Sequence, residues 1–353
     1  MLRDMARQPR VMAGLLDRTG EFLALGRDLL APRPGGRLFV CGCGDGVFAA
    51  RAAAGWAADA GLDWRPVGAL DLLLQAGRLS GADRVVAVSM SGNVDRTVEA
   101  AQAAVAQGVP LLALVNGGGG RLGAVAGSMV SLDVPDEAPF LCGTTSYTAT
   151  VMALVLLAAG AGQPGMVDRL GAAVGMSEAA LLAAEAVILP PGWLPTGVRV
   201  LAAGPEMGTA FYGAAKLVEL TRVPAWAADL EEFAHSQYWA MPATDLVVVV
   251  ATEPALARFA TETCAALRQL GVVTMGIDTP QSPVLTATVR VTLPVTEPSL
   301  APLASALPLQ WLAHQLAVRT GLDPDTRVHL KADEPRFRVS RLLTRRVLAG
   351  TGH

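Results

Sequence analysis

Short apolar runs alternate with longer helical segments along the chain. The runs at 37–42, 84–89 and 109–116 are bounded by glycine or polar residues, which is typical of strands buried in a sheet. An alanine-rich helical segment follows the first run, and a helix is predicted over 93–107 after the second. Strands that alternate with helices predict a parallel sheet with helices on both faces.

The same pattern recurs in the second half of the chain at a nearly constant spacing. Three segments align with three later ones: 37–46 with 199–208, 85–89 with 246–251, and, one residue further, 108–116 with 271–279. A spacing kept over three strands indicates two copies of one α/β unit.

We therefore expect an α/β fold with two tandem doubly wound parallel-sheet domains, each an α/β/α sandwich. The expected parts are a helical leader at 1–36, a first domain at 37–165, a helical linker at 166–195 and a second domain at 196–353.

Composition and charge narrow the classes of partner. The chain is 52% hydrophobic and carries a net charge of −3, so charge gives no reason to expect nucleic acid or a membrane surface. The stretch 138–167 has no charged residue, but its apolar part, VMALVLLAA, is about half of the roughly 20 residues that a membrane span needs. We expect a buried helix there.

The cysteines and the first residues indicate a cytoplasmic protein. The four cysteines lie in apolar segments without a C-x-x-C pair, so we expect buried free thiols and no metal site: Cys41, Cys43, Cys142 and Cys264. The N-terminal residues lack the apolar core of a signal peptide.

Hydroxyl groups gather where the second predicted strand ends, in VAVSMSGNVDRT at 86–97. The second copy has Ala-Thr-Glu-Pro at the matching place. Ligands of open α/β sheets bind beyond the carboxyl ends of the strands, and a helix N-terminus favours phosphate. The loop is therefore either a phosphate site or a simple helix cap made by Ser91.

The glycine-rich run VCGCGDG after the first strand has a second interpretation as a nucleotide-binding loop. That interpretation requires an acidic residue at the end of the next strand to hold a ribose, and Ser89 stands there instead. A methyltransferase or dinucleotide enzyme is therefore disfavoured.

Together, the Gly-Cys-Gly turn at 42–44 and the S-x-S-G-x(4)-T loop at 89–97 resemble the signature of the sugar isomerase (SIS) domain family. Two tandem copies resemble the isomerase half of glucosamine-6-phosphate synthase and the stand-alone sugar-phosphate deaminases and deglycases. We expect no glutaminase domain. The resemblance implies that phosphate is held by the loop and the turn, through Ser89, Ser91, Asn93, Thr97 and Gly44.

Three positions depart from the family pattern. Met90 stands where the family usually has glutamine, and Asp45 stands where it has serine or threonine. Thr144 and Thr145 match a substrate-binding stretch whose lysine is replaced by Ser146. A carboxylate beside a phosphate is unfavourable unless it is paired, so Asp45 either has a partner such as Arg96 or meets an amine or hydroxyl of an atypical substrate.

The segment at 214–237 resembles the catalytic segment of the family. Lys216 and Glu219 are spaced i, i+3 and share one helix face, which is also typical of an exposed ion pair. The resemblance makes Glu219 the base that moves a proton between C1 and C2, and His235 the residue that opens the sugar ring. It makes Glu232 a positioning residue, and it implies a homodimer because this segment is often donated across the dimer interface.

The segment at 321–332 resembles the closing segment of the family, in which a lysine meets the open-chain carbonyl. Lys331 takes that place here, unless it is simply an exposed lysine near the end of the chain. A basic helix at 336–348 follows, which we interpret as a packing helix rather than a nucleic-acid site.

The sequence thus predicts a cytoplasmic enzyme that acts on a sugar phosphate by aldose–ketose isomerisation, with or without release of ammonia or an amine. No metal or redox cofactor is implied. Two alternatives stay open: a phosphosugar-binding regulator without catalysis, and an SIS enzyme diverged to an unusual biosynthetic substrate.

Overall fold

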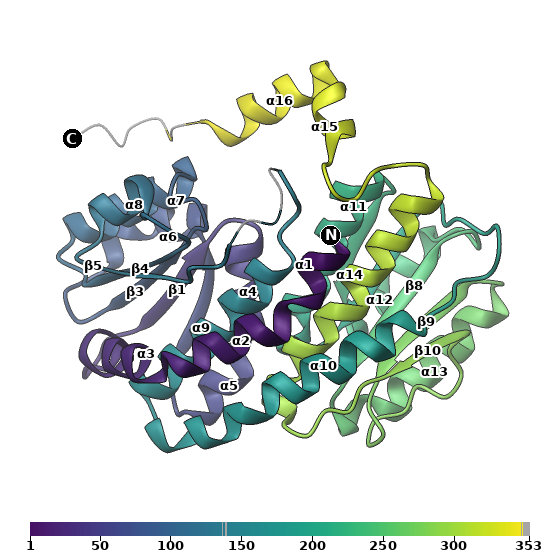
Figure 1. Ribbon diagram of the computed structural model, residues 1–353, viewed down its shortest axis with the longest axis horizontal. Helices are drawn as coiled ribbons and strands as arrows, with labels where there is room; N and C mark the ends of the chain where they lie inside the picture. Colours follow the sequence, from purple (N-terminus) through teal and green to yellow (C-terminus); the bar gives the residue numbers. More distant parts are fainter. Residues whose placement is uncertain (136, 138–139, 347, 349–353) are drawn as a thin grey trace.

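Two five-stranded parallel sheets lie side by side in a computed structural model that describes residues 1–135, 137, 140–346 and 348 (Figure 1). The first sheet has the order β2-β1-β3-β4-β5, with β1 Leu38–Gly42, β2 Trp64–Gly68, β3 Arg84–Val88, β4 Leu111–Val115 and β5 Ser128–Ser131. The second has the order β10-β9-β8-β6-β7, with β6 Val198–Ala202, β7 Ala225–Asp229, β8 Leu246–Ala251, β9 Val273–Asp278 and β10 Val289–Thr292. Read from β7, the second sheet repeats the strand order of the first. The predicted α/β fold with two parallel sheets is confirmed.

Helices cover both faces of each sheet and fill the space between the sheets (Figure 1). The helices that form the inner layers are α4 Asp45–Ala52, α5 Ala54–Asp59, α9 Thr145–Ala161, α11 Glu206–Thr221 and α14 Ala301–Arg319. The others are α1 Leu2–Ala6, α2 Gln8–Asp17, α3 Thr19–Leu25, α6 Ala69–Leu74, α7 Asp95–Ala106, α8 Gly120–Val125, α10 Ala172–Glu185, α12 Leu230–His235, α13 Ala257–Gln269, α15 Val328–Ala332 and α16 Glu334–Thr344.

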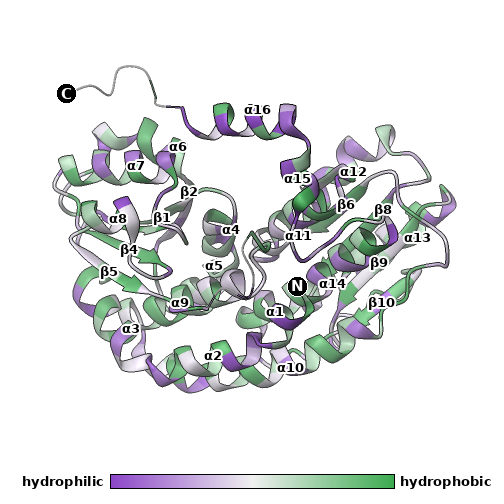
Figure 2. Cartoon of the chain, turned by 45° about the horizontal axis from the view of Figure 1, so that its top comes forward, coloured by the Kyte–Doolittle hydropathy of each residue, from purple (hydrophilic) through white to green (hydrophobic). Residues whose placement is uncertain are grey.

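The central strands are apolar on both faces because helices cover both sides. In β3, Val86 and Val88 pack into the core between the two sheets, whereas Val85 and Ala87 pack into the outer core beneath α6 and α7. The inner core is continuous from the first sheet to the second, where it includes Val200. Figure 2 shows this concentration of apolar residues in the strands and inner helices.

Helix α9 lies within the uncharged stretch of the sequence at 138–167 and includes its apolar part VMALVLLAA. Nearly all of its residues are buried, and it packs against α2, α3 and α4. This confirms the prediction of a buried helix. In the described part of the chain, no helix combines the length and the apolar character that crossing a membrane requires.

The helices α4 and α11 join the two halves of the molecule at close range. A Cβ atom at Gly208 would lie 2.4 Å from the backbone nitrogen of Ala52, so glycine permits the close approach. This contact brings the first turn of α4 beside α11 and thereby positions the charged side chains described below.

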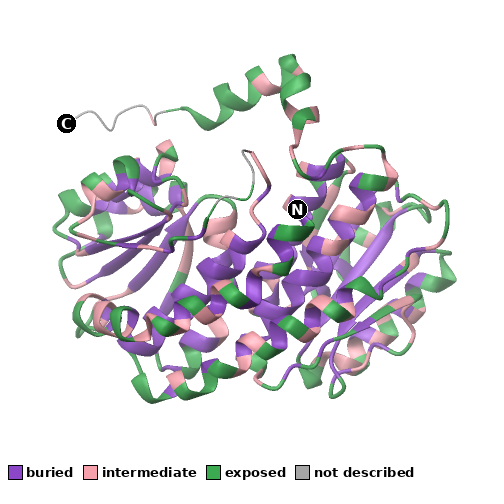
Figure 3. Cartoon of the chain, viewed as in Figure 1, coloured by how far each residue is buried: buried purple, intermediate pink, exposed green. Residues whose placement is uncertain are grey.

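The last helix, α16, projects from the main body, whereas α15 is hydrogen bonded to the end of α11 through His329 (Figure 3). An ion pair of 3.3 Å between Arg222 and Asp333, the residue between α15 and α16, also holds this segment to the second half. At the other end, Arg96 of α7 donates a 2.7 Å hydrogen bond to the carbonyl of Arg346. The segment therefore runs from one half of the molecule to the other.

Candidate active site

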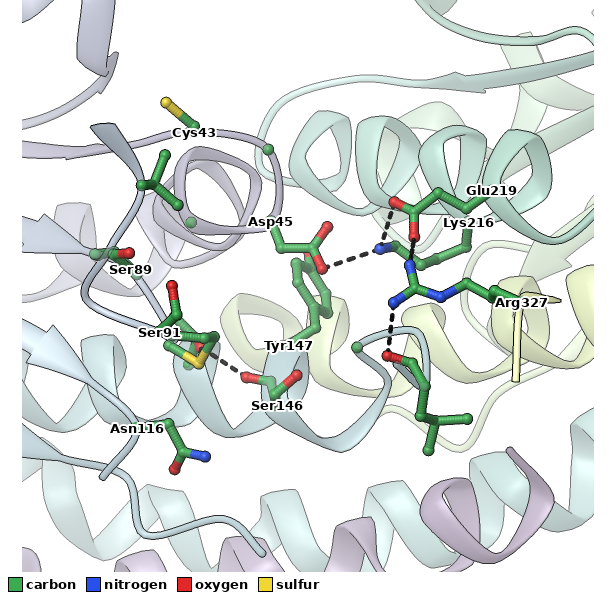
Figure 4. A pocket seen from close by; sticks show the side chains of 18 residues that line it. Cys43, Asp45, Ser89, Ser91, Asn116, Ser146, Tyr147, Lys216, Glu219 and Arg327 are labelled. Atoms are coloured by element: carbon green, nitrogen blue, oxygen red, sulfur yellow. Dashed lines mark hydrogen bonds and ion pairs between the residues drawn. The ribbon is translucent and has the colours of Figure 1, made fainter. Parts of the chain in front are cut away.

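A cavity of about 560 Å³ lies beyond the carboxyl ends of β1 and β3, between α4, α9 and α11 (Figure 4). This is the edge at which parallel sheets bind their ligands, and the volume suits a small molecule. Its polar lining consists of Cys43, Asp45, Ser89, Ser91, Asn116, Ser146, Tyr147, Thr150, Lys216, Glu219 and Arg327.

One end of the cavity is formed by the serine loop after β3. Ser89 is only 5% exposed, and its Oγ has no hydrogen-bond partner in the described part of the chain. Ser91 accepts a 3.2 Å hydrogen bond from the backbone N–H of Asn93. The loop needs Gly92, which has a φ of +63° and lies against the carbonyl of Gly119. An unpaired buried hydroxyl at a cavity wall is free to bind a ligand.

A glycine turn brings α4 against this loop. Gly44 has a φ of +54° and ψ of −125°, a conformation that side chains disfavour, and α4 begins directly after it at Asp45. A Cβ at either Gly42 or Gly46 would lie 3.0 Å from the carbonyl oxygen of Val88. The glycines therefore let the start of α4 lie directly beside the end of β3.

The opposite end of the cavity carries four charged side chains. The Nζ atom of Lys216 lies 2.9 Å from Glu219 Oε1 and 3.1 Å from Asp45 Oδ2. Arg327 Nη1 lies 2.7 Å from Glu219 Oε2. Lys216 is only 3% exposed, so its charge depends on the two carboxylates. The predicted residues Asp45, Lys216 and Glu219 are thus brought together.

Burial and pairing shift the pKa values at this end in defined directions. Burial raises the pKa of Asp45, and the opposing attraction of Lys216 only partly offsets that effect. Burial would lower the pKa of Lys216, but the charges of Asp45 and Glu219 outweigh it and raise the pKa above its ordinary value. The two carboxylates therefore favour the charged form of Lys216 over the neutral amine.

Arg327 is a site residue that the sequence analysis did not single out. Besides Glu219, its guanidinium donates to the carbonyls of Phe140 at 2.8 Å and Leu141 at 2.9 Å. Its backbone is left-handed with φ of +49°, and His329 Nε2 lies 2.9 Å from the carbonyl of Glu219. The segment that carries Arg327 is the same 321–332 segment that the resemblance indicated, so its position was the available signal.

Three predicted catalytic or positioning residues do not line the cavity of their own chain. His235 lies on α12, is 68% exposed and contacts Glu231 at 3.0 Å. Glu232 is also exposed on this short helix, which the Asp229 side chain caps. Lys331 is exposed, and its Nζ lies 3.9 Å from the centre of the Phe140 ring.

Thr144 and Thr145 also lie outside the cavity. Both side chains are buried and hydrogen bond to Asp4 of α1, the first to its carboxylate and the second to its backbone carbonyl. The backbone N–H of Thr145 donates to the same carboxylate at 3.0 Å. They attach the N-terminal helices to α9, and the next residue, Ser146, lines the cavity instead.

The predicted residues Asn93 and Thr97 do not line the cavity, and their side chains make contacts within the protein instead. Asn93 donates from its amide to the carbonyl of Ser91 at 2.8 Å and accepts from the N–H of Arg121 at 3.2 Å. Thr97 is buried, with its Oγ1 3.6 Å from Cys43 Sγ. Cys43 corrects our expectation of buried thiols: it is exposed because it follows the end of β1, in the turn before α4. In the described residues no three His, Cys, Asp or Glu side chains cluster to hold a metal ion.

Solved structures share this fold. The C-terminal domain of glucosamine-fructose-6-phosphate aminotransferase from Francisella tularensis is 16% identical, with a TM-score of 0.76 over 92% of this chain and 97% of that one. Glucosamine-6-phosphate deaminase from Thermotoga maritima is 17% identical, with a TM-score of 0.70 over 92% and 96%. Tagatose-6-phosphate ketose/aldose isomerase from Escherichia coli is 18% identical, with a TM-score of 0.70 over 92% and 94%. At these identities the likeness shows the fold, which is the tandem SIS fold that the motifs predicted.

No model of a protein family matches the chain, and no curated protein matches its sequence.

Proposed function

We propose that this protein is a sugar-phosphate isomerase of the SIS type. One observation carries the proposal: Glu219 lies between two cations in a cavity whose other end presents the unpaired hydroxyl of Ser89 at the carboxyl edge of a parallel sheet. The names of structures with the same fold, which include two sugar-phosphate enzymes, support the same reaction class. Deamination of an aminosugar phosphate is the narrower form of the proposal.

The serine loop holds the phosphate in this proposal. Ser89 and Ser91 offer hydroxyl donors, and no charged side chain lines that end of the cavity among the described residues. Hydroxyl and N–H donors bind phosphate without a cation when they converge at one place. A sugar phosphate held there extends toward Glu219.

Glu219 acts as the mobile base. It removes the proton from C2 of the open-chain aldose and becomes neutral. The electron pair of that C–H bond forms the C1–C2 double bond, and the π electrons of the C1 carbonyl move to O1, which becomes an oxyanion. Before the transfer the charge of Glu219 offsets Lys216 and Arg327; once Glu219 carries the proton it is neutral, and the two cations then stabilise the oxyanion at O1. The proton of O2 passes to O1, the carbonyl forms at C2, and Glu219 returns its proton to C1.

We propose that ring opening uses His235 from a second copy of the chain. His235 is exposed beside Glu231 and Glu232 and does not line the cavity of its own chain. A homodimer that seats α12 at the cavity of its partner would supply the imidazole, which can accept and return a proton at O5.

Proton NMR in D2O tests the reaction. We expect deuterium to enter C1 or C2 of a hexose or 2-amino-hexose 6-phosphate with the native chain, and Glu219→Gln to slow the exchange about 10²- to 10⁴-fold. Glu262→Gln is the matched control, because Glu262 is exposed on α13 and pairs with Arg258 on the same helix. Binding of a phosphosugar without exchange would favour the regulator. The absence of both binding and exchange would overturn the proposal.

A further inference from the structure

One oxygen of the Asp45 carboxylate binds a side chain of the protein, and the other is available to a ligand. Its Oδ2 contacts Lys216 at 3.1 Å, whereas Oδ1 makes no hydrogen bond within the described part of the chain. The side chain is 30% exposed, and Asp45 lines the cavity. A hydrogen-bond acceptor therefore faces the ligand at the N-terminus of α4, where an anion would otherwise be favoured.

The charges around Asp45 leave no cation to neutralise a ligand anion there. Four charged side chains line the cavity in the described structure, two of each sign, and they sum to zero. Lys216 is already shared between Asp45 and Glu219, and the guanidinium of Arg327 is taken up by Glu219, Phe140 and Leu141. A phosphate beside Asp45 would be repelled, and a cationic donor would be attracted.

The position of Asp45 also fixes which part of a substrate it meets. Asp45 and Glu219 both contact the single Nζ atom of Lys216, at 3.1 Å and 2.9 Å. Figure 4 shows Asp45 between the serines and Glu219. A group that reaches Oδ1 therefore lies next to the carbons on which Glu219 acts, while the phosphate lies at the serine end.

We propose that Asp45 determines specificity by binding an ammonium group carried on the substrate beside the reacting carbons. The substrate class is then a 2-amino sugar phosphate rather than the 2-hydroxy analogue. This inference rests on the proposed function, because it takes the phosphate to bind at Ser89 and Ser91 and the proton transfer to occur at Glu219. A hydroxyl at the same place forms a neutral–ionic hydrogen bond, whereas an ammonium forms one between two charges, which is stronger.

The test compares a matched pair of substrates, glucosamine 6-phosphate and glucose 6-phosphate, by deuterium exchange at C2. We expect the native chain to prefer the amino sugar in kcat/KM by about tenfold to a hundredfold. Asp45→Asn is expected to bring that ratio close to one. Because Asp45 also pairs with Lys216, the variant slows both substrates, and only the ratio reports on recognition of the ammonium group. Asp28→Asn is the control, since Asp28 is exposed and pairs with its neighbour Arg27.

Each outcome decides one of the two proposals. The native ratio is measured first, since no folding defect of a variant can affect it. Exchange of both sugars at equal rates by the native chain, or an unchanged preference in Asp45→Asn, overturns the role of Asp45 and leaves the isomerase proposal standing. Absence of exchange and binding with either sugar overturns the proposed function, and this inference with it.

Discussion

The carboxylate of Asp45 contacts the ammonium of Lys216 at 3.1 Å, although the two residues belong to different halves of the molecule. Asp45 begins α4 beside the first sheet, and Lys216 lies on α11 beside the second. The contact depends on the close crossing of these helices at Gly208. The charged end of the cavity is therefore a property of the packed pair of sheets and of neither sheet alone.

Gly208→Ala tests this dependence. The added Cβ would lie 2.4 Å from the backbone nitrogen of Ala52, so the helices must move apart. We expect a loss of about 1–3 kcal/mol in the free energy of unfolding and a slower exchange reaction. Urea denaturation and the NMR exchange assay measure the two effects.

Gly175→Ala is the matched control for that substitution. Gly175 lies within α10 with open space around its Cα, so alanine should keep or raise stability by up to about 1 kcal/mol. Equal effects of the two substitutions would show that the close crossing does not position the site.

A second prediction compares the contributions of Arg327 and Lys331, two cations of the 321–332 segment, to the reaction. Arg327→Gln removes the contact with Glu219 and weakens those with the carbonyls of Phe140 and Leu141, so we expect the exchange rate to fall by about 10²-fold or more. Lys331→Gln should have a much smaller effect, because Lys331 is exposed and does not line the cavity of its own chain. Initial rates at saturating substrate measure both, and thermal melting identifies any loss of folded protein. The reverse order of effects would restore the role that the family resemblance gave to Lys331.

The sequence was sufficient for the parts of the structure that depend on local patterns. Buried strands need apolar residues on both faces, so β1, β3 and β4 were visible as short apolar runs. The glycine turn and the serine loop also have local signatures, which placed Asp45 and Ser89 at the correct edge of the sheet. The division of the chain at residues 36, 165 and 195 stays a prediction.

Contacts between distant segments were not predictable in the same way. The approach of Arg327 to Glu219 joins α11 to a loop about a hundred residues later, and no periodic pattern encodes that meeting. Thr144 and Thr145 matched a binding stretch by position, yet Asp4 takes up their hydrogen bonds because it lies at the start of α9. Which side chain faces a cavity depends on tertiary packing, and one residue along a helix turns it by about 100°.

Mixing two inactive variants tests whether His235 serves the cavity of a partner. Glu219→Gln removes the base and His235→Asn removes the imidazole, so each homodimer should be slow with the cyclic sugar phosphate. A mixed dimer contains one site with both native residues, and co-expression should therefore restore part of the activity. The assay is the exchange rate of the co-expressed, tandem-tagged heterodimer.

Two outcomes would contradict the shared site. Absence of any rescue in a verified heterodimer would place His235 outside the reaction or inside its own chain's site. A His235→Asn chain with native activity would remove the residue from the mechanism. Neither outcome would affect the assignment of Glu219.

Glu206 at the start of α11 predicts a pH dependence of stability. Burial raises the pKa of its carboxyl, and hydrogen bonds from Ser305 at 2.6 Å and Thr252 at 2.8 Å oppose that effect only in part. A carboxyl with a raised pKa in the folded state binds its proton more tightly there than in the unfolded chain. Its contribution to stability is therefore fully present below 4.5, the ordinary value, and is lost as the pH rises through the raised pKa.

Glu206→Gln should remove that loss, because the amide keeps the size of the side chain and carries no charge to bury. We expect the variant to match the native chain near pH 4.5 and to be more stable than it near neutral pH, as measured by urea denaturation across that range. Glu262→Gln, on the exposed face of α13, should leave the pH profile unchanged. A variant that is less stable than the native chain near neutral pH, with a smaller deficit near pH 4.5, would mean instead that Ser305 and Thr252 require an ionised acceptor and that Glu206 is charged in the folded protein.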